Sequence, residues 1–73
     1  MATLEEYIRR SGYQIGHIAE QLFLTRSGLY RKLTGQRGWT QAEMEKLKSM
    51  LRITEQDAAY IFYPEKARYV TKN

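Results

Sequence analysis

Residues 15–35, IGHIAEQLFLTRSGLYRKLTG, constrain the fold of this chain more than any other stretch. Apolar side chains recur four residues apart in each half of it, which is the spacing of a buried stripe on an α-helix. These pairs are Ile18 with Leu22, and Leu29 with Leu33. Thr25, between the pairs, is a favourable residue for starting a helix. The stretch therefore predicts two short helices, over about 15–22 and 26–34, joined by a tight turn.

Three more helices are predicted around this pair, because each has a recognisable start. A threonine followed three residues later by an acidic residue satisfies the free amides at a helix N-terminus. Such pairs are Thr3 with Glu6, Thr40 with Glu43, and Thr54 with Asp57. Gly12 suits the end of the first helix, and Pro64 stops the fifth helix after about Phe62. The fold class predicted is all-α, a compact five-helix domain over residues 1–73.

The last ten residues have a less decisive pattern. Ala67, Tyr69 and Thr71 alternate with Arg68, Val70 and Lys72, which fits either a short β-strand or a frayed basic end. An edge strand would give a second copy of the chain something to pair with. Both interpretations stay open, and residues 54–73 are a candidate dimerisation tail.

The distribution of charge indicates a polyanionic partner. The net charge is +4 and the sequence pI is about 9.6. No acidic residue occurs between Glu20 and Glu43, an interval that contains four basic residues. They are Arg26, Arg31, Lys32 and Arg37. Basic residues concentrated in one segment are typical of nucleic-acid binding.

Several other classes of function are disfavoured by the residues available. The chain has no cysteine and one histidine, so we expect no metal site and no cofactor. It offers no carboxylate pair, nucleophile with a base, or glycine-rich phosphate loop, so we do not expect the protein to be an enzyme. Without an apolar run at its start or one of membrane-spanning length, the chain is expected to carry no signal peptide and to be cytoplasmic.

A family resemblance enters at Ile18-Ala19-x-x-Leu22-x-Leu24-Thr25-x-Ser27-x-Leu29, followed by YRKLTG. This pattern resembles the lambda-repressor-like, or Cro and repressor, helix-turn-helix family, and the chain's size resembles the short Cro-like regulators of bacteriophages. The resemblance covers about residues 4–62. It implies a transcriptional regulator of a bacterial host that binds double-stranded DNA at a pseudo-palindromic operator.

The same resemblance implies which side chains contact DNA. Base contacts are expected from the first turn of the second motif helix and from one turn later, at Arg26, Ser27 and Arg31. Backbone contacts are expected at Gln14, Gly16, Thr34, Gln36 and Arg37. Residue chemistry adds Tyr30 and Lys32 to the backbone group. An arginine fork matches O6 and N7 of guanine, whereas phosphate contacts carry no sequence information. For Lys32 and Arg37, a solvated surface charge is the equally weighted alternative.

The chain departs from the family pattern at three positions. Phe23 stands where the family often has glycine, and because phenylalanine disfavours a left-handed backbone, we expect a different turn geometry. Ile15 begins the first motif helix where the family often has glutamine. Lys32 stands where relatives have a large apolar residue, so Leu33 is expected to supply that anchor.

One such domain makes few contacts with DNA, so a two-fold dimer is predicted, with half-sites about one helical turn apart. Its interface is expected at Tyr60, Ile61, Phe62, Tyr63 and Tyr69, although Ile61 and Phe62 are equally suited to closing the monomer core. The alternative function is an antirepressor-type module of the same fold that binds a partner repressor. The basic second helix of the motif favours DNA binding, and the aromatic residues and mixed charges of residues 52–70 keep this alternative open.

Overall fold

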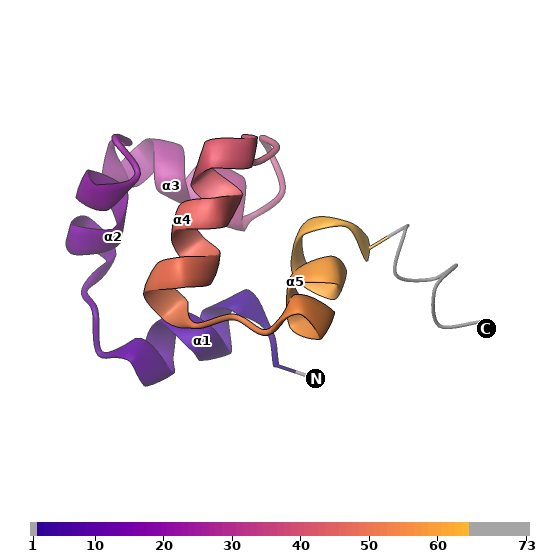
Figure 1. The fold of residues 1–73 in the computed structure, drawn as a ribbon. Helices are drawn as coiled ribbons and strands as arrows, with labels where there is room; N and C mark the ends of the chain where they lie inside the picture. Colours follow the sequence, from indigo (N-terminus) through magenta and orange to yellow (C-terminus); the bar gives the residue numbers. More distant parts are fainter. Residues whose placement is uncertain (1, 65–73) are drawn as a thin grey trace.

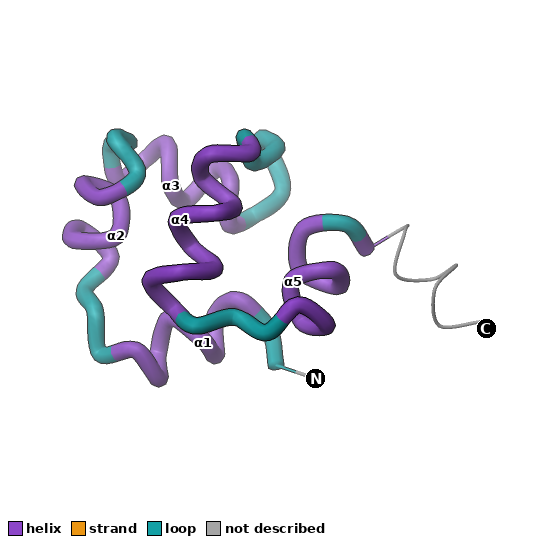
Figure 2. The backbone as a smooth tube through the Cα atoms, viewed as in Figure 1, coloured by secondary structure: helices purple, strands orange, loops and turns teal. Residues whose placement is uncertain are grey.

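The computed structural model describes residues 2–64, which form five helices and no strand. Their bounds are α1 (Leu4–Ser11), α2 (Ile15–Gln21), α3 (Arg26–Leu33), α4 (Gln41–Leu51) and α5 (Glu55–Phe62) (Figures 1 and 2). The prediction of an all-α five-helix domain is therefore confirmed. The strand considered for the tail lies outside the described residues, and so does Tyr69.

Threonine side chains begin four of the five helices. In each case the threonine Oγ1 accepts a hydrogen bond from the backbone amide three residues later, as the sequence pattern predicts. The four N-caps are Thr3, Thr25, Thr40 and Thr54. At α4 the Glu43 carboxylate also accepts from the Thr40 amide at 2.9 Å, which completes a capping box. Helix α2 differs, since the side chain of its N-cap Gln14 makes no capping bond.

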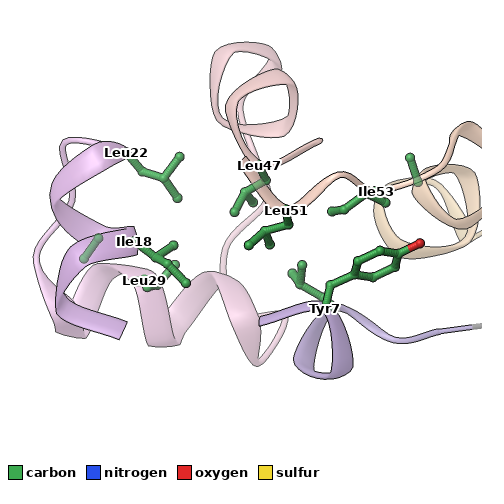
Figure 3. Close-up of a cluster of buried hydrophobic side chains, with 10 residues drawn as sticks. Tyr7, Ile18, Leu22, Leu29, Leu47, Leu51 and Ile53 are labelled. Atoms are coloured by element: carbon green, nitrogen blue, oxygen red, sulfur yellow. The ribbon is translucent and has the colours of Figure 1, made fainter. Parts of the chain in front are cut away.

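The hydrophobic core draws on all five helices (Figure 3). Its buried members are Leu4, Tyr7, Ile18, Ala19, Leu22, Leu29, Leu47, Leu51, Ile53 and Ala58. Ile18, Leu29 and Leu47 are fully buried, and they come from α2, α3 and α4. Burial of a large aliphatic side chain contributes about 1.5–3 kcal/mol. These three residues therefore fix the inner faces of α2 and α3 against α4.

Helix α5 lies at the opposite end of the molecule from α2 (Figure 1). Tyr7 of α1 holds the start of α5, because its hydroxyl donates to Asp57 Oδ2 at 2.5 Å and accepts from the Thr54 amide at 3.4 Å. Lys48 of α4 forms an ion pair with Glu55 of α5 at 2.5 Å. With α5 fastened to α1 and α4, the α2–α3 pair is left at the other end of the molecule.

The turn between α2 and α3 corrects the prediction made for Phe23. This residue has a left-handed backbone with φ +59°, the conformation that glycine would adopt, and its ring is 96% exposed. The Leu24 amide donates to the Ala19 carbonyl at 2.9 Å, and the Phe23 amide donates to Glu20 at 3.1 Å. These two bonds form a Schellman helix end. The geometry expected of glycine is thus retained, at a cost of about 1–2 kcal/mol for a side chain in this conformation.

Candidate nucleic-acid interface

The outer face of α3 is polar and exposed. Arg26, Ser27, Tyr30 and Arg31 are all exposed, and Tyr30 retains 52% of its accessible surface. Their spacing places them on one side of the helix, because residues three and four apart are neighbours on a helix surface. Leu29 is fully buried on the other side. Helix α3 is therefore anchored along one face and presents two guanidinium groups on the other.

The charges carried by α3 and the loop after it are all positive. Within residues 2–64, the side chains of Arg26, Arg31 and Arg37 form no hydrogen bond or ion pair, so their donors are available to a ligand. Residues 21–42 include no acidic side chain. Glu43, the next acid along the chain, is buried and paired with a lysine. The segment thus exposes cationic donors without a nearby exposed carboxylate of its own, an arrangement suited to polyanions.

Lys32 is a correction to the predicted set of phosphate contacts. Lys32 is only 9% exposed, and its Nζ donates to Glu43 Oε1 at 2.6 Å and to the Gly38 carbonyl at 3.1 Å. The ammonium group is therefore committed to α4 and to the loop after α3. Leu33, expected to supply the apolar anchor, is partly buried and packs against the hydrophobic core, and Lys32 beside it is also turned inward. A buried charge is tolerated there because it is paired and hydrogen-bonded.

The environment of Glu43 stabilises its ionised form. Burial alone would raise the pKa of this carboxyl group, because desolvation disfavours charge. Hydrogen bonds from Lys32 and from the Thr40 backbone, together with the positive charge of Lys32, outweigh that effect and leave the pKa of Glu43 below its usual range. The carboxylate therefore stays ionised at neutral pH and holds both the N-terminus of α4 and the side chain of Lys32.

The other residues predicted to contact the DNA backbone flank α3. Gln14, Thr34, Gln36 and Arg37 are exposed, and Gly16 is half-buried. The Thr34 hydroxyl already donates to the Tyr30 carbonyl at 2.9 Å, and Gln36 Nε2 donates to Thr34 Oγ1 at 3.2 Å. The hydroxyl proton of Thr34 is therefore occupied within α3, whereas Arg37 retains all of its side-chain donors.

The residues predicted for a dimer interface divide between core and surface. Tyr60, Ile61 and Phe62 are half-buried, and Tyr63 is 41% exposed. Ile61 and Phe62 pack against the hydrophobic core, and the Phe62 ring meets Trp39 edge-to-face at 6.0 Å. These contacts favour the interpretation that Ile61 and Phe62 close the monomer core. Trp39 packs against the hydrophobic core as well.

The part of the chain that the structure describes offers no competing metal site. No group of three or more metal-ligating side chains occurs among residues 2–64. The single histidine, His17, is exposed, and its ring lies 5.2 Å from that of Tyr13. No described helix combines the length and apolar character needed to cross a membrane.

The Lys32–Glu43 pair was missed by sequence reasoning, although a signal for it was present. Lys32 follows Leu29 by three residues, which places both on the same side of a helix. A cation on a buried face requires a counter-charge. Glu43 was assigned only to the capping box, and nothing in the local pattern identified a second role for a residue eleven positions away.

Comparisons of the chain with protein-family models, with curated proteins and with solved structures found no match. The fold is therefore defined by the structure as an all-α domain of five helices across the described residues. Membership of the lambda-repressor-like family remains a prediction from the sequence motif.

Proposed function

We propose that this protein is a sequence-specific, double-stranded DNA-binding transcriptional regulator of the Cro and repressor type, acting in the cytoplasm of a bacterial host. The observation that carries the proposal is the outer face of α3, where Arg26 and Arg31 are exposed and their side chains form no hydrogen bond or ion pair within residues 2–64. The opposite side of the same helix is fixed by fully buried Leu29. A rigid helix with a cationic face fits the major groove, which admits one α-helix.

In this proposal the exposed side chains divide between base and backbone contacts. Arg26 lies at the first position of α3 and carries the planar fork that pairs with guanine O6 and N7. Ser27 and Arg31 complete the base-reading group. Tyr30, Gln36 and Arg37 contact phosphates, which set the orientation of the domain without reading sequence.

A single eight-residue helix contacts few base pairs, so tight binding requires two copies. We propose a two-fold dimer on DNA whose half-sites are about one helical turn, roughly 34 Å, apart. Tyr60 and Tyr63 retain accessible surface on the α5 side of the molecule and are the described residues proposed for the contact. Light scattering that reports only monomer, both free and on DNA, would contradict the dimer.

The experiment that tests this function is selection of duplexes from random DNA by the full chain. We expect an enriched motif with two-fold symmetry and one spacing between its halves. Recovery of random sequence would contradict specific readout, and a single enriched half-site would contradict the dimer but retain the readout.

The second candidate function is that of an antirepressor, which would bind a partner repressor, and one observation favours it. Phe23 exposes nearly its whole ring in the turn before α3. A partner repressor that covered this ring would give a complex abolished by Phe23→Ala. The all-cationic face of α3 has no role in that account, so DNA binding is the function preferred.

A further inference from the structure

Gly16, the second residue of α2, provides the space in which the Arg26 side chain lies. A methyl group added to the Cα of Gly16 would be 2.7 Å from Arg26 Nη2, 3.1 Å from Nε and 3.2 Å from Cζ. All three are guanidinium atoms, and they are the three nearest neighbours of that methyl position outside the local backbone. The guanidinium group of α3 therefore lies across the first turn of α2 at the place where a side chain is missing.

The fold itself gives no other reason for a glycine at this position. Gly16 lacks the positive φ found at Gly12 and Gly35, so its backbone suits any residue. Alanine has a higher intrinsic helix propensity than glycine, so helix formation gives no reason for a glycine here. The nearest obstacle to alanine is the far end of a flexible arginine, which can move aside without disturbing the backbone.

No bond holds the guanidinium group in this position. Within residues 2–64, Arg26 makes neither a hydrogen bond nor an ion pair, so its direction depends on the space available beside it. An arginine recognises a base through two parallel hydrogen bonds from a planar fork, and such a contact depends on the orientation of that plane. A side chain at residue 16 would therefore change the direction from which the Arg26 guanidinium group approaches a base, without changing the charge of α3.

We propose that Gly16 is a specificity-determining residue that positions the Arg26 guanidinium group for base recognition. This proposal rests on the proposed function, in which Arg26 reads a base. It assigns to Gly16 a role different from the backbone contact predicted from sequence, since Gly16 acts here through Arg26.

The test is Gly16→Ala, with Gly38→Ala as the matched control. A methyl group at Gly38 meets no atom within 4 Å, and its φ is not positive. For Gly16→Ala we expect a melting temperature equal to or above that of the wild type. We expect the preference for the selected duplex over a duplex altered at the Arg26 base to fall about tenfold, within the range that one bidentate contact provides. Gly38→Ala should leave this preference unchanged.

A double-mutant cycle separates positioning from a direct contact of Gly16 with DNA. In an Arg26→Ala background, Gly16→Ala should cause no further loss of affinity for the selected duplex, because the group it displaces is absent. A loss of equal size in both backgrounds would overturn the proposal, as would an unchanged preference in the single variant.

A measurement without DNA distinguishes failure of this proposal from failure of the proposed function. In the free protein, the side-chain Nε–Hε resonance of Arg26 should shift in Gly16→Ala and remain in place in Gly38→Ala. An unmoved resonance would overturn the positioning role whatever the protein binds. A moved resonance in a protein that binds no DNA would reject the proposed function and, with it, the specificity role, while leaving the packing of Arg26 on Gly16 established.

Discussion

Arg26 and Lys32 are two cations on one eight-residue helix, and their environments are opposite. Arg26 is exposed at the first position of α3, with no bonding partner among residues 2–64. Lys32 is buried near the other end of the helix, and its ammonium group lies 2.6 Å from a Glu43 carboxylate oxygen. The difference shows that a basic sequence segment combines exposed, unpaired charges with buried, structural charges. The face of the helix and the position of the nearest acid decide between them.

The largest effect on stability should come from removing the buried charge of Lys32. Lys32→Ala leaves the buried Glu43 carboxylate without its cation, and removing one partner of a buried pair costs about 3–5 kcal/mol. We expect a loss of about 3 kcal/mol in the free energy of unfolding, measured by urea denaturation. Lys46→Ala removes an exposed lysine and is the control, with an expected change within about 0.5 kcal/mol. Equal stabilities for the two variants would show that the pair is not a structural contact.

The exposed cation should behave in the opposite way. Arg26→Ala is expected to leave the unfolding free energy within about 0.5 kcal/mol of the wild type, because an exposed, unpaired side chain contributes little to folding. It should reduce binding to the selected duplex by about 1–3 kcal/mol and remove the preference among bases at one position. Competition binding with single-base variants measures this preference. An equal loss of affinity on every duplex would contradict a base-reading role for Arg26.

The comparison extends to the backbone conformation of the two residues that lie before and after α3. Phe23 before α3 and Gly35 after it both have left-handed φ values, +59° and +83°. Phe23→Gly should stabilise the fold by about 0.5–1 kcal/mol because it relieves the strain of a side chain in this conformation. Gly35→Ala should destabilise it by about 1 kcal/mol for the converse reason.

Phe23→Ala is the control for this pair, since it removes the exposed ring and keeps the Cβ atom. Thermal denaturation of the three variants should rank Phe23→Gly as the most stable and Gly35→Ala as the least stable. A Phe23→Gly variant no more stable than Phe23→Ala would show that the left-handed turn carries no strain.

The other partner of the buried pair, Glu43, should set part of the pH dependence of stability. Because the folded state lowers the pKa of Glu43, its contribution to stability is fully present above the unfolded pKa, roughly 4.3, and is lost as pH falls through the lower folded pKa. Glu43→Gln should therefore lose stability at neutral pH and show a weaker decline of unfolding free energy with acidification below about pH 4. Urea titrations at several pH values measure the difference. Parallel declines for variant and wild type would contradict the assignment.

The helices themselves were predictable because their signals are local. Thr40 and Glu43 satisfy each other's backbone groups within one turn, so a short stretch of sequence identifies the start of α4. The apolar stripe that contains Leu29 likewise identifies the buried side of α3 without knowledge of the helices packed against it. The start of a helix and its buried face depend on residues three or four apart, and those relations are visible in the sequence.

The errors arose where distant residues determine the outcome. For Lys32 the sequence suggests either a phosphate contact or a solvated surface charge, and neither anticipates its buried partner on another helix. Phe23 was expected to alter the turn, since a local preference disfavours its backbone conformation. Burial of Leu22 and the two Schellman hydrogen bonds outweigh that preference. The space that Gly16 leaves for Arg26 depends on how α2 crosses α3, which no pattern within either helix indicates.

The central claim, that the free cations of α3 and its following loop bind DNA, is tested most directly by a salt series. The affinity of the full chain for its selected duplex would be measured at increasing monovalent salt. If Arg31, Arg37 and their neighbours displace counterions from phosphates, the logarithm of the affinity should fall linearly with the logarithm of salt concentration, with a slope of about −0.9 per phosphate contacted. Affinity that does not decline as salt rises would contradict DNA binding by this surface.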